Sequence, residues 1–123
     1  MIKFEVDPAR NRFVIRYSGT VTPEETEKGI EEFRVGLPKL QSGFRLLADL
    51  SELESMDVKC ARFIEKAMDL CNEKGPSMVV RVVPDPHRDI GMSIMSIFHY
   101  RSDVKIFTCQ SLREADEILA DEE

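Results

Sequence analysis

The sequence predicts an α/β domain with a single mixed β-sheet flanked by helices. Residues 2–7 and 12–17 alternate apolar and charged side chains, as half-buried strands do. Residues 44–50 and 78–83 are nearly continuous apolar runs, the pattern of strands that are covered on both faces. Amphipathic helical patterns follow the apolar strands, and strand–helix–strand connections place successive strands in parallel.

The first two strands are predicted to form an antiparallel hairpin around a turn at residues 8–11. Residues 19–22 contain glycine and threonine and are expected to end the second strand. Thr22 is the predicted N-cap of a first helix, with Glu25 three residues later in a capping-box arrangement. Pro38 predicts a kink or a break near the end of this helix.

A second helix is predicted over residues 57–74, where Asp57 is favoured over Ser55 as the cap and Gly75 ends the helix. Its inward stripe is predicted to hold Cys60, Phe63, Ile64, Ala67, Met68 and Cys71.

The remaining elements are a third helix over residues 89–100, capped by Asp89 or a neighbour, and a last strand over residues 104–108. A C-terminal helix begins after Ser111, with Ala115, Ile118 and Leu119 facing inward. The predicted order is therefore β-β-α-β-α-β-α-β-α.

Length and composition indicate one soluble domain over residues 1–123 with an acidic tail at 121–123. The net charge of −6 disfavours nucleic acid and anionic membrane as partners, and no apolar run is long enough to span a bilayer. We expect a cytoplasmic protein. The three cysteines lack metal-site spacing and are predicted to be free, buried thiols: Cys60, Cys71 and Cys109.

Residues 44–71 contain the predicted functional region. The acidic stretch 49–57 is predicted to be a loop between a buried strand and the second helix. In α/β sheets, ligands and partners bind where the carboxyl end of a strand meets the following helix.

Several short motifs along the chain resemble the STAS domain, the SpoIIAA-like family of bacterial anti-sigma factor antagonists. Residues 13–19 are similar to the family's second strand, which ends in glycine, and residues 75–80 and 104–107 to two later strands. Residues 46–51, followed by Met56 and Asp57, are similar to its apolar strand, Asp-Leu-Ser stretch and helix-opening aspartate.

The resemblance implies a non-catalytic regulatory module that docks around the start of the second helix onto a kinase-like or sigma-pathway protein. An acidic rim around a few apolar side chains suits such a contact, because the charges guide the approach of the partner and the buried apolar side chains provide the affinity. A homodimer through a sheet edge or the third helix is compatible with it. The surface is expected to contain Ser51, Glu52, Glu54, Ser55, Met56, Asp57, Val58, Lys59 and, from the third helix, Met92.

The chain departs from the family at its regulatory motif. The family has Asp-Ser-Ser-Gly or Asp-Ser-Thr-Gly, with a phosphorylated serine after the aspartate, whereas residues 57–60 read Asp-Val-Lys-Cys. No hydroxyl follows Asp57, so the resemblance implies a module that is not switched by phosphorylation at this position. The acidic stretch can equally be a solvated turn.

Other classes of function remain as alternatives. A small apolar or anionic ligand could bind near His87, Arg88 and Asp89, at the predicted start of the third helix. An enzyme would need a reactive Cys60 or His87, and packing thiols are the simpler explanation. A receiver domain with Asp49 as its phosphate acceptor would need an acidic pair after the first strand, where this chain has Asp7 alone. The sequence indicates no cofactor and no metal site.

Overall fold

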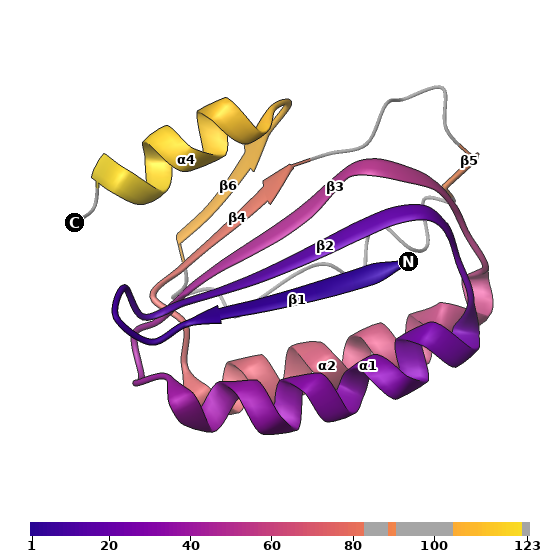
Figure 1. Cartoon of the computed structure of the whole chain (residues 1–123), viewed down its shortest axis with the longest axis horizontal. Helices are drawn as coiled ribbons and strands as arrows, with labels where there is room; N and C mark the ends of the chain where they lie inside the picture. Colours follow the sequence, from indigo (N-terminus) through magenta and orange to yellow (C-terminus); the bar gives the residue numbers. More distant parts are fainter. Residues whose placement is uncertain (83–88, 91–104, 122–123) are drawn as a thin grey trace.

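The computed structural model describes residues 1–82, 89–90 and 105–121. Its central feature is one mixed sheet in the order β1-β2-β3-β4-β6, in which the short β5 pairs with β3 (Figure 1). β1 and β2 are antiparallel, and the other pairs are parallel. The predicted α/β class with a single mixed sheet is confirmed. The strands are β1 (Ile2–Asp7), β2 (Arg12–Val21), β3 (Arg45–Met56), β4 (Met78–Val82), β5 (Asp89–Ile90) and β6 (Lys105–Cys109).

Helices cover both faces of the sheet. Figure 1 shows α1 (Pro23–Gly36) and α2 (Ala61–Lys74) side by side on one face, and α4 (Leu112–Asp121) on the other. Two 3-10 helices, η1 (Leu37–Lys39) and η2 (Val58–Cys60), follow α1 and precede α2. No helix among the described residues is long and apolar enough to cross a membrane.

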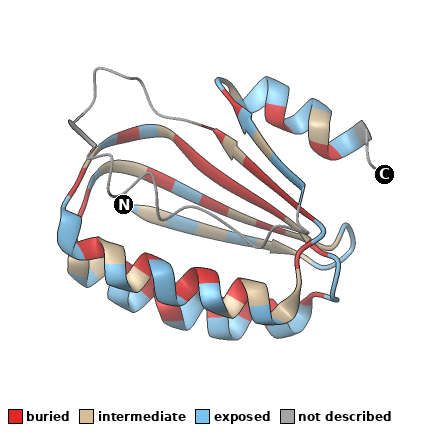
Figure 2. Ribbon diagram, turned by 180° about the vertical axis from the view of Figure 1, so that it is seen from behind, coloured by how far each residue is buried: buried red, intermediate tan, exposed pale blue. Residues whose placement is uncertain are grey.

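Alternation along the strands divides the core into two clusters, one on each face. The larger lies beneath α1 and α2 and includes Phe13, Leu46 and Phe33. The smaller lies beneath α4 and includes Leu47 and Val80. In Figure 2, buried residues run along the central strands and along the sheet-facing sides of the helices.

The predicted turn and caps are confirmed. Asn11 occupies the left-handed region at φ 54°, as the hairpin turn requires. Thr22 Oγ1 accepts a hydrogen bond from the Glu25 backbone N–H at 3.3 Å, and Ser111 Oγ accepts one from the Glu114 N–H at 3.2 Å. Gly75 ends α2 in the left-handed conformation. α1 gives way to η1 at the predicted break before Pro38.

The predicted ends of β2 and β3 were wrong. β2 does not stop at Gly19 but continues to Val21, and β3 continues to Met56, so most of the acidic stretch is strand and not loop. The two strands stay paired through two register shifts, one of them beside Gly19 at φ 63°. Each shift adds an unpaired residue, so the apolar residues of β3 no longer alternate.

The third helix was predicted to begin at Asp89. Asp89 and Ile90 instead form β5, which pairs in parallel with Ser55 and Met56 of β3. Asp89 therefore does not cap a helix. Residues 91–100 of that predicted helix lie outside the described residues.

Candidate functional site

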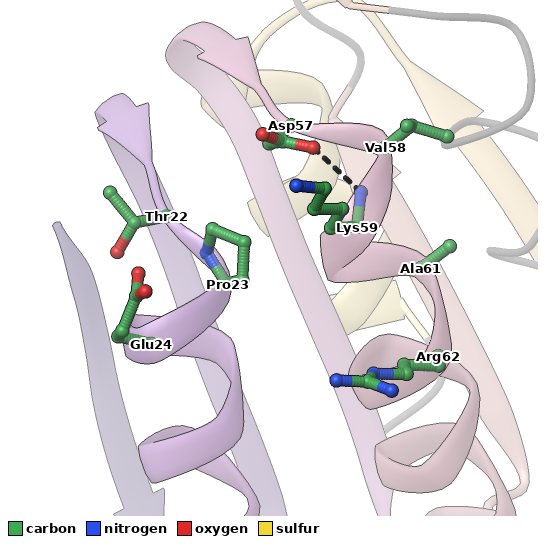
Figure 3. Close-up of a pocket in the computed structure, with 8 residues that line it drawn as sticks. All are labelled: Thr22, Pro23, Glu24, Asp57, Val58, Lys59, Ala61 and Arg62. Carbon is green, nitrogen blue, oxygen red and sulfur yellow. Dashed lines mark hydrogen bonds between the residues drawn. The ribbon is translucent and has the colours of Figure 1, made fainter.

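The end of β2 and the end of β3 are neighbours in the sheet, because Val21 pairs with Met56. The next residue of each strand, Thr22 and Asp57, caps the helix that follows. As a result, α1 and η2 begin side by side (Figure 3).

Between the two helix starts lies an open groove of about 900 Å³, which we call the helix-start groove. Both caps are satisfied locally, since Asp57 Oδ1 accepts a hydrogen bond from the Lys59 N–H at 2.8 Å and Thr22 caps α1. The groove is lined by Thr22, Pro23, Glu24, Asp57, Val58, Lys59, Ala61 and Arg62.

The groove has mixed charge. Figure 3 shows the Lys59 and Arg62 side chains reaching toward α1, where Glu24 lies, and Asp57 beside Lys59. The guanidinium of Arg62 lies 4.7 Å from the centroid of the Phe63 ring, a cation–π distance. The groove therefore carries both signs of charge.

Val58 is the exposed apolar residue of this surface. Its relative exposure is 59%, and Figure 3 shows its side chain on the side of η2 away from α1. It follows Asp57 directly, and the short 3-10 turn holds it at the start of the helix. The position is thus accessible but has no hydroxyl group.

The thiol of Cys60 holds η2 against the end of β2. Its Sγ donates to the carbonyl oxygen of Val21 at 3.7 Å, and its N–H donates to the Asp57 carbonyl at 2.9 Å. Burial raises the pKa of the Cys60 thiol, and burial raises the pKa of Cys71 to about 12. The prediction of free, buried thiols is confirmed for Cys60, Cys71 and Cys109. A buried, protonated Cys60 does not support the nucleophile hypothesis.

The structure divides the predicted partner surface. Asp57, Val58 and Lys59 line the helix-start groove. Glu52 and Glu54 are exposed on β3, and Ser51 and Ser55 are half-buried there. The two serines are engaged within the sheet: the Ser51 hydroxyl donates to Asp49 Oδ1 at 2.6 Å, and the hydroxyls of Ser55 and Thr20 lie 3.0 Å apart.

Met56 was predicted to be a surface residue and is instead buried in the core beneath α1 and α2. Met56 is buried because β3 extends as far as this residue, and its side chain lies on the same inward side of the strand as Leu53. Met92, His87 and Arg88 lie outside the described residues, and Asp89 is described only as part of β5.

Asp49 is buried inside the sheet. It is 3% exposed, and its Oδ1 accepts hydrogen bonds from the backbone N–H and the hydroxyl of Ser51. Its other oxygen lies 3.7 Å from Nε of Arg16. A carboxylate enclosed by these donors stabilises the middle of β3, and the geometry does not favour a phosphate acceptor.

Sequence reasoning missed the contribution of α1 to the groove. Thr22 and Pro23 were recognised as a helix start but not as neighbours of Asp57. Two parallel strands that are adjacent in a sheet place their following helices at the same edge, but the adjacency of β2 and β3 is known only from the structure.

The comparisons with known proteins support the fold. Neither a protein-family model nor a curated protein sequence matches the chain. The structure of the anti-sigma factor antagonist SpoIIAA in its unphosphorylated form is similar, with a TM-score of 0.64, 15% identity and coverage of 98% of both chains. The chain has the SpoIIAA-like fold.

A second similar structure is an uncharacterized protein from the DUF3478 family of Shewanella loihica PV-4, which has a SpoIIAA-like fold. The TM-score is 0.66 at 16% identity, and the match covers 96% of this chain and 93% of that one. The STAS resemblance of the sequence therefore holds at the level of the fold over nearly the whole chain.

Proposed function

We propose that the chain is a non-catalytic regulatory module of the bacterial cytoplasm that docks onto a regulatory protein through the helix-start groove and Val58. The observation that carries the proposal is the exposure of Val58 beside charges of both signs. An exposed apolar side chain next to charged residues suits a protein contact, because the apolar group loses water on binding and the charges orient the partner.

The similarity in fold supports a class of partner. A similar structure is that of an anti-sigma factor antagonist, so we propose a kinase-like or sigma-pathway protein as the partner of this module. The three buried, free thiols support a reducing compartment such as the cytoplasm.

The module would bind without the serine switch that the STAS resemblance implies. Phosphorylation adds about two negative charges to a hydroxyl-bearing side chain. Val58 occupies the position directly after Asp57 at the start of η2 and cannot accept a phosphoryl group there. Control of binding would then depend on the concentration of the partner or on its own state.

The test is affinity capture from lysate of the source organism with wild type, Val58→Lys and Val35→Lys, read by mass spectrometry. Val35 is a matched control, because it is an equally apolar residue, 54% exposed on the last turn of α1. We expect a regulatory protein that wild type and Val35→Lys retain and that Val58→Lys loses. Equal capture by all three proteins would remove Val58 from the interface.

A further inference from the structure

β1 forms one margin of the sheet in Figure 1. All six of its residues pair with β2, and no other described strand pairs with its second edge. Lys3 and Glu5 are exposed on one face. On the other face, Ile2, Phe4 and Val6 are only partly buried against the core beneath α1 and α2. Such an edge offers backbone groups to another strand.

The hydrogen bonds at the start of β1 show which backbone groups point outward. The N-terminal ammonium group of Met1 donates to the Ser18 carbonyl at 2.7 Å, and the Ser18 N–H donates to the Met1 carbonyl at 2.8 Å. Antiparallel strands alternate between such bonded pairs and non-bonded pairs. Lys3 and Glu5 therefore share the orientation of Met1 and direct their backbone groups to β2. The N–H and C=O groups of Ile2, Phe4 and Val6 point to the second edge of β1, which no other described strand pairs with.

We propose that β1 pairs antiparallel with β1 of a second copy of this chain, about a twofold axis at Phe4. In this register Phe4 lies opposite Phe4 of the second copy, and Ile2 lies opposite Val6. Each of these outward residues then donates one backbone hydrogen bond and accepts one. The two sheets join into one continuous sheet.

Charge selects this register. Lys3 of each copy lies opposite Glu5 of the other, so the exposed face gains opposite-charge pairs on both sides of the axis. A register centred on Lys3 places two lysines opposite each other, and one centred on Glu5 places two glutamates opposite each other. A register shifted by a single residue places the apolar residues of one β1 opposite the charged residues of the other.

The isolated chain leaves these charges poorly matched. Lys3 pairs in register with Arg16 of β2, which has the same sign. Glu5 Oε2 lies 3.5 Å from Nη1 of Arg16 on an exposed surface, where an ion pair contributes little to stability. The Glu5 of a second copy offsets the positive charge around Lys3. The strand is thus complementary to itself, and this favours a second copy over a foreign strand.

The apolar face supports the same pairing. The Phe4 ring packs edge-on against Phe33, with centroids 5.5 Å apart, and against Phe13 at 6.3 Å. A second Phe4 at the axis extends this aromatic cluster across the interface. α1 packs closely on β1, since a Cβ on Gly29 would lie 3.1 Å from the Phe4 ring. The edge is therefore held in place before binding, which lowers the entropic cost of association.

Sedimentation equilibrium over a wide concentration range tests the proposal with four variants. Lys3→Glu and Glu5→Lys each place like charges opposite one another and should weaken dimerisation about tenfold or more. The double variant restores opposite charges and should recover most of the wild-type affinity. Lys105→Glu on β6, at the other margin of the sheet, is the control and should have no effect. Circular dichroism confirms that each variant is folded.

A wild type that stays monomeric, or single variants that dimerise as wild type does, overturns the proposal. So does a double variant that stays as weak as the single ones.

Hydrogen exchange locates the interface without a substitution. We expect the amide protons of Phe4 and Val6 to exchange more slowly as protein concentration rises, because they are bonded only in the dimer. The amides of Lys3 and Glu5 point to β2 and should not change. Concentration-dependent protection of β6 amides in place of these would show that another edge dimerises and that the β1 assignment is wrong.

Discussion

Cys60 and Val21 are joined by a hydrogen bond from the Cys60 thiol to the Val21 carbonyl oxygen, with 3.7 Å between sulfur and oxygen. The contact links the start of α2 to the end of β2, which are 39 residues apart. It sets how closely η2 lies to the cap of α1. The width of the helix-start groove therefore depends on a small, buried side chain at position 60.

Cys60→Ala should lower the free energy of unfolding by about 1–2 kcal/mol, because it removes buried sulfur and leaves the Val21 carbonyl without this donor. Urea denaturation measures the change. Cys109→Ala is the comparison, since Cys109 is also buried but belongs to the cluster beneath α4. If capture of the partner falls with Cys60→Ala and not with Cys109→Ala, the thiol positions the groove. Equal effects on capture would contradict this role.

Lys59→Glu tests the charge on the groove. Lys59 reaches toward α1 in Figure 3, and reversing its charge should slow association with the captured partner and change its salt dependence. The Asp57 cap accepts from the backbone of residue 59, so the substitution leaves the cap intact. Lys39→Glu, at the end of η1, is the control. Surface plasmon resonance at low and high salt gives the rates, and identical rates for both variants would exclude Lys59 from the contact.

Local patterns were sufficient to predict most of the fold. Alternation gave β1 and the start of β2, and the caps at Thr22 and Ser111 follow from side-chain chemistry within a few residues. The second half of β3 was missed because Leu50, Leu53 and Met56 recur every third residue. In a strand without irregularities, the residues that face the core recur every second position. Only the pairing with β2 reveals the register shifts that change this spacing in β3.

The candidate site was predicted in part for a similar reason. Asp57, Val58 and Lys59 were found from the chemistry of a helix start, which is local. Their neighbours on α1 depend on the order of strands in the sheet. Nothing in the sequence near Thr22 states that β2 lies beside β3, so the other wall of the groove required the tertiary structure.

Alkaline pH should destabilise the protein through its buried thiols. Burial raises the pKa of Cys71 from 9.0 to about 12, and burial also raises the pKa of Cys109 and Tyr17. Above pH 9 the unfolded chain releases the Cys71 proton while the folded chain keeps it. The contribution of this thiol to the free energy of unfolding is therefore complete below pH 9 and is lost as pH rises toward 12. In this range the free energy of unfolding falls by about 1.4 kcal/mol per pH unit.

Urea denaturation at pH 8, 9 and 10 measures this slope, and Cys71→Ala should make it shallower. A free energy of unfolding that is the same at pH 8 and pH 10 would contradict the prediction. So would an unchanged slope in the variant.

Two glycines on α1 should respond differently to alanine, because they face different parts of the sheet. A Cβ on Gly36 would lie 2.8 Å from the Phe13 ring and 2.9 Å from Val6, and Phe13 is held by stacking on Phe33 at 5.2 Å. Overpacking costs about 1–3 kcal/mol, which exceeds the helix propensity gained from alanine, about 1 kcal/mol. Gly36→Ala should therefore destabilise the protein by about 1–2 kcal/mol.

Gly29→Ala is the matched control on the same helix. Its Cβ would lie 3.1 Å from the far end of the Phe4 ring, a contact that a shift of a few tenths of an ångström relieves. The gain in helix propensity should offset this small displacement, so the free energy of unfolding should change by less than about 0.5 kcal/mol. Urea denaturation of both variants measures the two changes in the free energy of unfolding. Equal stability would show that the sheet beneath Gly36 yields as readily as its edge, and that α1 does not fix the position of β1.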